Sequence, residues 1–147
     1  MGIRKARISD GNTIITLLDQ LGYPQTNFFI NEKIERLLEC PDAQLLVYEL
    51  AGQVAAFISL HFIPQIALEG DFARISYFAV DSAYRSQGIG HEMLDFCFEL
   101  ARERKCDRFE VHSHTRRTGA HRFYLREGFE ESPKHFFKML VYEVEPE

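Results

Sequence analysis

The segment Val80-Asp81-Ser82-Ala83-Tyr84-Arg85-Ser86-Gln87-Gly88-Ile89-Gly90 decides the interpretation of this sequence. It follows an apolar stretch that predicts a strand over 72–80, and it leads into an amphipathic pattern over 89–101 that predicts a helix. At such a turn the first helical N–H groups have no intrahelical acceptor, and the helix dipole adds positive potential. Two glycines spaced i, i+2 allow an anion to approach these N–H groups closely. The turn is therefore a candidate pyrophosphate-binding site.

Other phosphate-binding motifs fit this turn poorly. No Gly-Lys-Ser or Gly-Lys-Thr follows the glycines, so the turn is not a P-loop. The third glycine of a dinucleotide-binding fingerprint is also missing from Gly88-Ile89-Gly90-His91-Glu92-Met93. For two glycines alone, a tight turn without a ligand is the simpler interpretation, so the choice depends on the rest of the chain.

The remaining pattern predicts strands and helices along the whole chain. The pattern predicts strands over 2–8, 44–50, 54–62, 72–80, 107–115, a short stretch from Phe129, and 135–144. Residues 76–80, at the end of the fourth strand, are apolar enough to be buried on both faces of a sheet. Helical segments begin after Asp10 and end at Gly22, run from Asn27 or Asn31 to Cys40, begin at Ile89, and cover 118–127 with Gly128 as the closing residue. The order βααβββαβαββ predicts an α/β (α+β) fold whose mixed, mostly antiparallel sheet has about seven strands, with four helices.

Composition indicates one globular domain. The 147 residues suit a single domain over 1–147, with 46% hydrophobic and 27% charged residues. A net charge of −5 disfavours a nucleic-acid partner. The three cysteines, Cys40, Cys97 and Cys106, are odd in number and lack zinc-finger spacing, so neither a disulfide framework nor structural zinc is expected. Since the sequence shows no signal-like run and no apolar stretch of about 20 residues, we expect a cytoplasmic protein without a membrane partner.

Two motifs, in this order, resemble the signatures of the GNAT superfamily of N-acetyltransferases. Arg85-Ser86-Gln87-Gly88-Ile89-Gly90 resembles its acetyl-CoA signature, Arg/Gln-x-x-Gly-x-Gly/Ala. Ala120-His121-Arg122-Phe123-Tyr124-Leu125-Arg126-Glu127-Gly128-Phe129 resembles the second signature, A-x-x-F-Y-x-x-x-G-F. The resemblance covers essentially the whole chain, because the predicted order of elements is also that of the superfamily. Within it, the segment 121–128, preceded by Arg116-Arg117, is most similar to aminoalkylphosphonate N-acetyltransferases.

The resemblance implies an acetyl-CoA cosubstrate and the residues that bind it. They are Phe78, Ala79, Val80, Arg85, Ser86, Gln87, Gly88, Ile89, Gly90, His91, Arg117, Ala120, Phe123 and Tyr124. The pantetheine arm is implied to lie along the strand that ends at Val80, where N–H groups near Ala79 and Val80 would stabilise charge developing on the thioester oxygen. The superfamily commonly has Asn where this sequence has Arg117. That arginine would reach a CoA phosphate or an anionic acceptor group, unless it is simply solvated.

Acetyl transfer to an amine needs a proton donor for the leaving thiolate and a proton acceptor for the amine. The second signature implies Tyr124 as the donor; a core aromatic paired with Phe123 is the alternative interpretation. Related enzymes often carry Glu in the strand before the turn, where this sequence has Ser76 and Tyr77. Candidate acceptors are therefore Glu69, Asp71 and His61, each of which would otherwise be a solvated surface residue.

The expected acceptor is a small molecule with a primary amine. By family geometry, substrate-binding residues are Tyr23, Phe28, Arg74, His112 and His114. The two strand histidines alternate onto one face, but a metal site there would need a third ligand such as His61 or Asp71, so no metal is expected. Two other functions stay open: acetylation of a protein N terminus or lysine, and a catalytically weak acyl-CoA-binding regulatory module. A homodimer formed through the strand 135–144 is a further expectation by analogy.

Overall fold

The computed structural model describes residues 2–112, 118–132 and 136–142, and the chain divides into two compact units, Met1–Val111 and His112–Glu147. The first unit contains one sheet whose strands lie in chain order: β1 (Gly2–Lys5), β2 (Ala43–Leu50), β3 (Gln53–Ile63), β4 (Phe72–Val80) and β5 (Arg108–Val111). Neighbouring strands are antiparallel except for β4 and β5, which are parallel. This arrangement confirms the predicted mixed, mostly antiparallel sheet.

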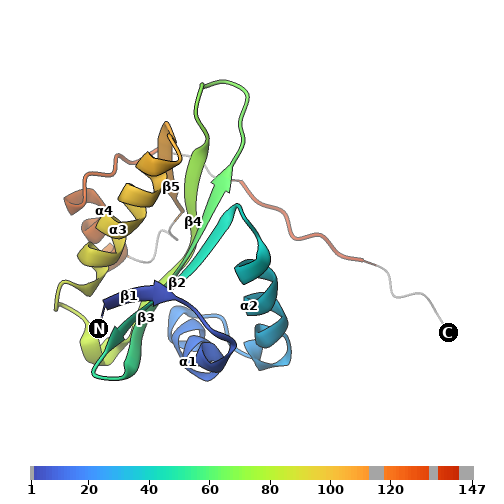
Figure 1. The fold of residues 1–147 in the computed structure, drawn as a ribbon, viewed down its shortest axis with the longest axis vertical. Helices are drawn as coiled ribbons and strands as arrows, with labels where there is room; N and C mark the ends of the chain where they lie inside the picture. Colours follow the sequence, from blue (N-terminus) through green and yellow to red (C-terminus); the bar gives the residue numbers. More distant parts are fainter. Residues whose placement is uncertain (1, 113–117, 133–135, 143–147) are drawn as a thin grey trace. The chain divides into compact units, whose positions relative to one another are not determined.

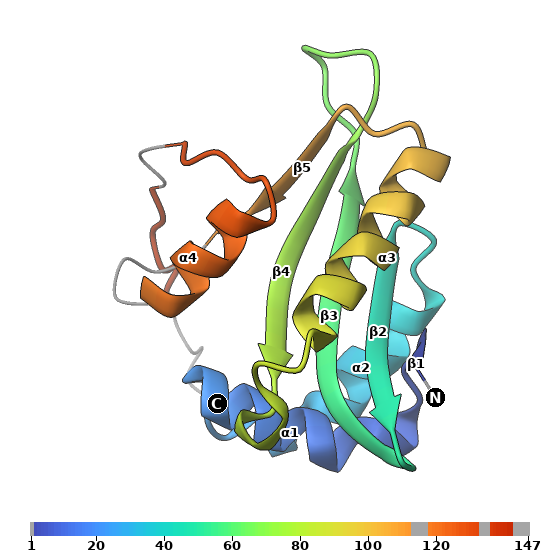
Figure 2. The ribbon, with the colours of Figure 1, turned by 90° about the vertical axis from the view of Figure 1, so that its left-hand side faces the viewer.

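Helices cover both faces of the sheet in the first unit. α1 (Gly11–Leu21) and α2 (Ile30–Glu39) lie on one face, and α3 (Ile89–Glu103), which connects β4 to β5, lies on the other (Figures 1 and 2). Leu17 and Ile34 of the two helices are buried in one core cluster with Val47 and Phe57 of the sheet. On α3, Met93, Leu94 and Cys97 are fully buried. The amphipathic spacing of these residues therefore positions the helices as predicted.

Gly22 ends α1 as the sequence predicts. Its φ of 106° is left-handed, its N–H donates to the carbonyl of Asp19 at 3.0 Å, and the N–H of Tyr23 donates to the carbonyl of Leu18 at 2.8 Å. These two bonds form a Schellman motif, which glycine adopts without steric cost. Tyr23 is consequently held immediately after the helix.

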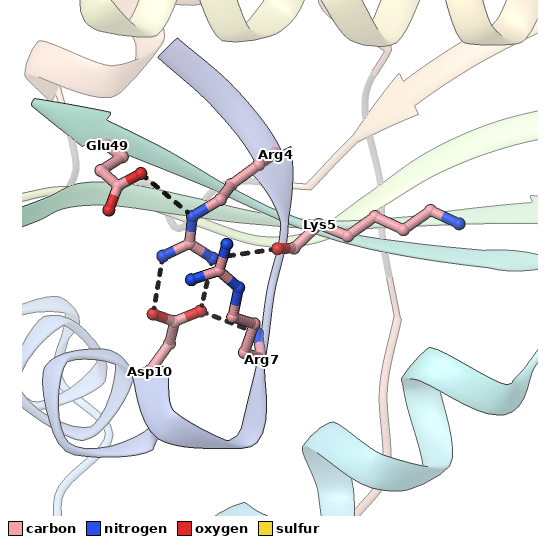
Figure 3. Close-up of polar contacts among 5 residues, drawn as sticks. All are labelled: Arg4, Lys5, Arg7, Asp10 and Glu49. Carbon is pink, nitrogen blue, oxygen red and sulfur yellow. Dashed lines mark hydrogen bonds and ion pairs between the residues drawn. The ribbon is translucent and has the colours of Figure 1, made fainter. Parts of the chain in front are cut away.

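A polar network joins β1, the short 3₁₀ turn η1 (Ile8–Asp10) and β2, as Figure 3 shows. The guanidinium of Arg4 donates to both carboxylate oxygens of Asp10, at 2.9 and 3.0 Å, and to Glu49 at 3.3 Å. The carboxylate of Asp10 also accepts from the N–H of Arg7 at 2.7 Å. Asp10 is the N-cap residue of α1, where the sequence places the start of the helix, but its side chain makes no cap hydrogen bond to that helix. The carboxylate instead accepts hydrogen bonds from Arg4, because the turn directs it back toward β1.

In the second unit, α4 (Thr118–Arg126) ends at Gly128, which has a φ of 94°. The N–H of Gly128 donates to the carbonyl of Leu125 at 3.2 Å, and the N–H of Phe129 donates to the carbonyl of Tyr124 at 3.0 Å. The rings of Tyr124 and Phe129 meet edge to face, with centroids 5.4 Å apart. This second Schellman motif, with its characteristic apolar contact, confirms the predicted closure by glycine and fixes the backbone that carries Tyr124.

The predicted number of strands is wrong. Among the described residues the sheet has five strands, because 129–132 and 136–142 form none, and the strand expected over 107–115 extends only from Arg108 to Val111. Residues 113–115, 135, 143 and 144 lie outside the described residues. Apolar composition alone does not make a strand, since its backbone groups need a partner strand. In the part of the chain that the structure describes, no strand pairs with 136–142, where Phe136 is 85% and Val141 91% exposed.

Within the described ranges, no helix combines the length and the apolar composition that crossing a membrane would require.

Candidate functional site

The turn between β4 and α3 has the geometry of an anion site. Ser86 and Gly88 both adopt left-handed backbone angles, with φ of 66° and 81°, and Gly88 is the N-cap of the 15-residue helix. The first helical hydrogen bond runs from the N–H of Glu92 to the carbonyl of Gly88 at 3.1 Å. The N–H groups of Ile89 and Gly90 therefore have no intrahelical acceptor. A Cβ placed on Gly88 would meet no atom within 4 Å, so the space beside this turn is open to a ligand.

The turn is braced from both sides. The N–H of Ser82 donates to the Gln20 side chain of α1 at 3.1 Å, and the N–H of Ala83 donates to the Asp81 carboxylate at 3.0 Å. The exposed Arg85 donates through Nε to the carbonyl of Val80 at 3.4 Å. These contacts hold the turn against α1 and the end of β4, so its N–H groups are preorganised.

A β-bulge interrupts β4 four residues before the turn. Ser59 of β3 is opposite Tyr77, while the next residue, Leu60, is opposite Ile75, so Ser76 is an extra residue on β4. β5 pairs with β4 only from Phe72 to Ile75, and the parallel pairing therefore stops where the bulge begins. A bulge bends its strand and increases the local twist, which explains why the two strands diverge there.

The ladder between β3 and β4 decides which backbone groups of β4 are directed toward the diverging edge. The N–H of Asp81 donates to the carbonyl of Ala55 at 2.8 Å, so alternation also directs the N–H of Ala79 toward β3. The N–H groups of Phe78 and Val80 are directed the opposite way. Two backbone N–H groups were expected to face the thioester oxygen. That of Val80 is directed toward the diverging edge of β4, whereas that of Ala79 is directed toward β3.

Beside the bulge, the sheet face shared with α1 and α2 carries a polar cluster. His61 of β3 lies opposite Arg74 of β4, and its Nε2 is 2.8 Å from the hydroxyl of Ser76 and 3.2 Å from that of Ser59. Ser59 is buried, His61 is half-buried and Ser76 is exposed. Burial and the charge of Arg74 lower the pKa of the His61 imidazole, in that order of importance. The neutral ring is therefore favoured near pH 7, with a lone pair available on one nitrogen.

Arg74 does not stand alone as a cation. Its Nε and Nη2 donate to one carboxylate oxygen of Glu110 on β5, at 3.1 and 2.7 Å, and Arg108 binds the other oxygen at 3.0 Å. Glu110 was missed by sequence reasoning, because only the parallel register of β4 and β5 brings it beside Arg74. The group Arg74–Glu110–Arg108 has a net charge of +1, which suits an anionic ligand less strongly than two unpaired arginines would.

Aromatic side chains border this face. The ring of Tyr23, just after α1, meets that of Tyr77 on β4 edge to face, with centroids 5.2 Å apart. Tyr23, Tyr77 and Phe28 are all exposed, Phe28 by 83%. The sequence shows Ser76 and Tyr77 only as positions without the usual acid, because their place beside His61 and Tyr23 depends on the bulge.

Glu69 and Asp71 lie apart from this cluster. The loop that carries Glu69 and Asp71 projects beyond the sheet at the end opposite the β4–α3 turn (Figure 2). Asp71 is about 30 Å along the strand from Val80 at 3.3 Å per residue, and its carbonyl accepts the N–H of Asp107. His112 follows β5 and is exposed, while His114 and Arg117 lie outside the described residues. Ala120, Phe123 and Tyr124 belong to α4 of the second unit.

The sequence profile of the acetyltransferase (GNAT) family matches residues 15–129. The chain therefore belongs to the GNAT family, and both the β4–α3 turn and α4 fall inside the matched region. Its fold is that of an acetyltransferase, with a mixed sheet and, in the part of the chain that the structure describes, four α-helices.

A more specific similarity is to the aminoalkylphosphonate N-acetyltransferase of Salmonella typhimurium. The two sequences are 35% identical over 96 residues, which make up 63% of this chain and 62% of that enzyme. The match thus spans less than two thirds of the relative's length.

Solved structures show the same fold. A transcriptional regulator from Bacillus halodurans superposes with a TM-score of 0.86 at 21% identity, covering 94% of this chain and 98% of that one. Glucosamine-6-phosphate N-acetyltransferase from Arabidopsis thaliana gives a TM-score of 0.81 at 23% identity, covering 95% and 97% of the two chains. At these identities the likeness concerns the fold alone.

Proposed function

We propose that the protein transfers the acetyl group of acetyl-CoA to the primary amine of a small molecule. The observation that carries this proposal is the β4–α3 turn, where left-handed Gly88 exposes the first amides of a long helix beside open space. Membership of the GNAT family supports the same reaction. The residues that would bind the cosubstrate are those of the turn, from Arg85 to His91, and the edge of β4 from Phe78 to Val80.

Acetyl-CoA would supply an activated acetyl group as a thioester. Its pyrophosphate would accept hydrogen bonds from the amides of the turn, which the helix dipole makes more favourable. Because the extended arm would run from the turn along β4, the reacting end would lie toward the bulge at Ser76. Backbone N–H groups directed to this edge would stabilise negative charge on the thioester oxygen, an effect typically worth about 3–4 kcal/mol per donor.

Tyr124 is the proposed proton donor to the departing sulfur. This assignment rests on the second family signature, and the Schellman motif after α4 fixes the backbone from which the phenol projects. A phenol with a pKa of about 10 can protonate a poorly solvated thiolate in the transition state. Arg117, Ala120 and Phe123 remain proposed contacts to the cosubstrate on the same basis.

The proposed acceptor is a small amine that also carries an anionic group. Tyr23 and Phe28 offer exposed aromatic surface, and the Arg74–Glu110–Arg108 group adds a net positive charge on the adjacent sheet. The name of the Salmonella relative makes aminoalkylphosphonates the first compounds to test. His112 and His114 remain proposed contacts of this region.

The test is release of CoA thiol from acetyl-CoA with a panel of aminoalkylphosphonates, uncharged primary amines and lysine-containing peptides. We expect turnover on small amines and preference for those with an anionic group. Turnover on peptides alone would contradict the small-molecule proposal. Tight CoA binding without turnover on any amine would indicate a binding module instead.

A further inference from the structure

We infer that Ser76 and His61 form a serine–histidine relay that takes the proton from the acceptor amine. The inference rests on the proposed acetyltransferase function and selects a proton acceptor from the three candidates that the sequence left open, adding Ser76 as the group between it and the amine. Ser76 would touch the amine, and His61 would receive the proton through the Ser76 hydroxyl. Glu69 and Asp71 would then have no part in proton transfer.

The bulge provides the geometry for this relay. As an extra residue, Ser76 extends its hydroxyl onto the face of His61, with 2.8 Å between Oγ and Nε2. Its other possible acceptor, the carbonyl of Ser59, is farther away at 3.3 Å. Ser76 is exposed where β4 diverges from β5, whereas Ser59 is 4% exposed. Of the two hydroxyls near His61, only that of Ser76 is therefore open to a substrate.

The charges around His61 suit a neutral base. Arg74, its opposite residue on β4, disfavours the imidazolium, and Glu110 and Arg108 of β5 lie beyond Arg74. On the other side, the β2 residue opposite His61 is Ala43, which carries no charge. The relay requires the tautomer with the proton on Nδ1, so that Nε2 accepts from Ser76.

In the transfer, each bond that forms is matched by a bond that breaks. The neutral amine forms a bond to the acetyl carbonyl carbon while the carbon–sulfur bond breaks. One nitrogen proton passes to Oγ of Ser76 as the Ser76 hydroxyl proton passes to Nε2 of His61, and the sulfur gains one proton from Tyr124. Nitrogen becomes acidic once bonded to that carbon, so even an imidazole of low pKa accepts its proton. Histidine and tyrosine then return to their starting states by exchange with solvent.

The kinetic test compares His61→Gln and Ser76→Ala with the wild type across pH, using the amine that the panel identifies. We expect kcat to fall roughly 10²-fold in His61→Gln and at least about 10-fold in Ser76→Ala, with a change of about twofold or less in the KM for acetyl-CoA. In the wild type, kcat should fall in acid through the pKa of His61, below its ordinary 6.5, and this limb should disappear in His61→Gln. Ser9→Ala, the same substitution in the exposed η1 turn, is the matched control and should keep wild-type kcat.

A structural role is separated from the relay by titrating His61 with NMR, its signal being assigned by its loss in His61→Gln. Ser76→Ala should raise the pKa of His61, since a donor to the neutral nitrogen is removed. An unchanged titration, an acid limb that persists in His61→Gln, or an equal loss of kcat in Ser59→Ala would each overturn the relay. In all these outcomes the wild type still turns over, whereas failure of the proposed function would appear as no turnover by the wild type.

Discussion

A neighbouring side chain decides how much charge Arg74 can offer a ligand. Its guanidinium is bound by Glu110, which also holds Arg108, so the two cations share one anion on this face. Because the sheet is accessible here, the exposed parts of these groups interact partly through solvent. Glu110 should therefore moderate the attraction that Arg74 exerts on an anionic acceptor.

Replacing Glu110 by Gln should strengthen binding of anionic amines. With its partner neutral, the pair Arg74 and Arg108 gains one unit of positive charge, so we expect the KM for an aminoalkylphosphonate to fall about fivefold, equivalent to roughly 1 kcal/mol. An uncharged amine of similar size is the control and should keep its KM. Equal effects on the two amines would mean that the acceptor does not lie beside Arg74.

Replacing Tyr124 by Phe should lower kcat about 10²-fold, because the proposed donor to sulfur is lost while the ring contacts with Phe123 and Phe129 are kept. Calorimetry should find an affinity for CoA close to that of the wild type. Full kcat in the variant would exclude Tyr124 as the acid and would favour its alternative interpretation as a packing residue.

Replacing Asp10 by Asn should destabilise the fold in a pH-dependent way. Burial alone would raise the pKa of the Asp10 carboxyl, but hydrogen bonds from Arg4 and from the N–H of Arg7 outweigh it and hold that pKa below 3.8 (Figure 3). The stabilisation is thus complete above the unfolded pKa and is lost as pH falls through the lower folded value. We expect a loss of about 1–3 kcal/mol in the free energy of unfolding at pH 7, shrinking below about pH 4.

Urea unfolding of the wild type, Asp10→Asn and the matched variant Asp19→Asn measures this effect. Asp19 is on the exposed side of α1, so its substitution should change stability little. A difference between Asp10→Asn and the wild type that stayed constant from pH 7 to pH 3 would show that the carboxylate charge contributes nothing.

At the scale of elements, the parts of the site that depend on local pattern were predictable. The bounds of β4 match the prediction, and α3 begins at Ile89, because an apolar run followed by glycine turns and helical spacing identifies both. The bulge was not predictable, since pairing with β3 defines it. If the alternation of a regular strand continued through Ser76, Phe78 and Val80 would lie on the same face as Arg74. The pairing of β4 with β3 instead puts Tyr77 and Ala79 on that face. The prediction that both faces of 76–80 are buried is therefore wrong at Ser76 and Tyr77, whose side chains are exposed.

The proposed role of the β4–α3 turn in binding pyrophosphate can be tested by Gly88→Val. A β-branched residue at a φ of 81° strains the turn and fills the open space beside the amides, so we expect CoA binding to be lost while circular dichroism stays nearly unchanged. Gly52→Val is the matched control, with a φ of 79° and similarly open space in the β2–β3 turn. Equal weakening of CoA binding by both variants would point to general strain.

At the scale of the whole chain, the family and topology were predictable but the extent of the sheet was not. Two spaced motifs identify the family because each needs particular residues at particular positions. The prediction of the last two strands was wrong. Residues 136–142 have a strand-like composition, but a strand also requires a partner strand, which no local sequence pattern reveals. The Met1–Val111 and His112–Glu147 units carry the turn and Tyr124 respectively, so the candidate site residues are divided between them. The proposed single domain and homodimer stay predictions.

Binding of the cosubstrate should stabilise the native chain as a whole. If CoA binds only the folded protein, a free concentration 100 times Kd adds about 2.7 kcal/mol and raises Tm by roughly 5–10 °C. Differential scanning fluorimetry with increasing CoA measures this shift, and adenosine is the control ligand without pyrophosphate. The same rise with both compounds would show that the turn does not recognise phosphate.

The bulge makes the length of β4 matter separately from its chemistry. Nine codons specify this strand, but they fill only eight ladder positions opposite β3. Deleting the codon for Ser76 would leave every other residue opposite its present partner, so the core and its alternation would survive. The strand would lose its bend, and β5 would then be able to form backbone hydrogen bonds with it beyond Ile75. For protein engineering, one missing triplet is therefore expected to close the gap between β4 and β5 at the candidate site of an otherwise intact fold, in addition to removing the Ser76 hydroxyl, and no single substitution would reproduce that closure.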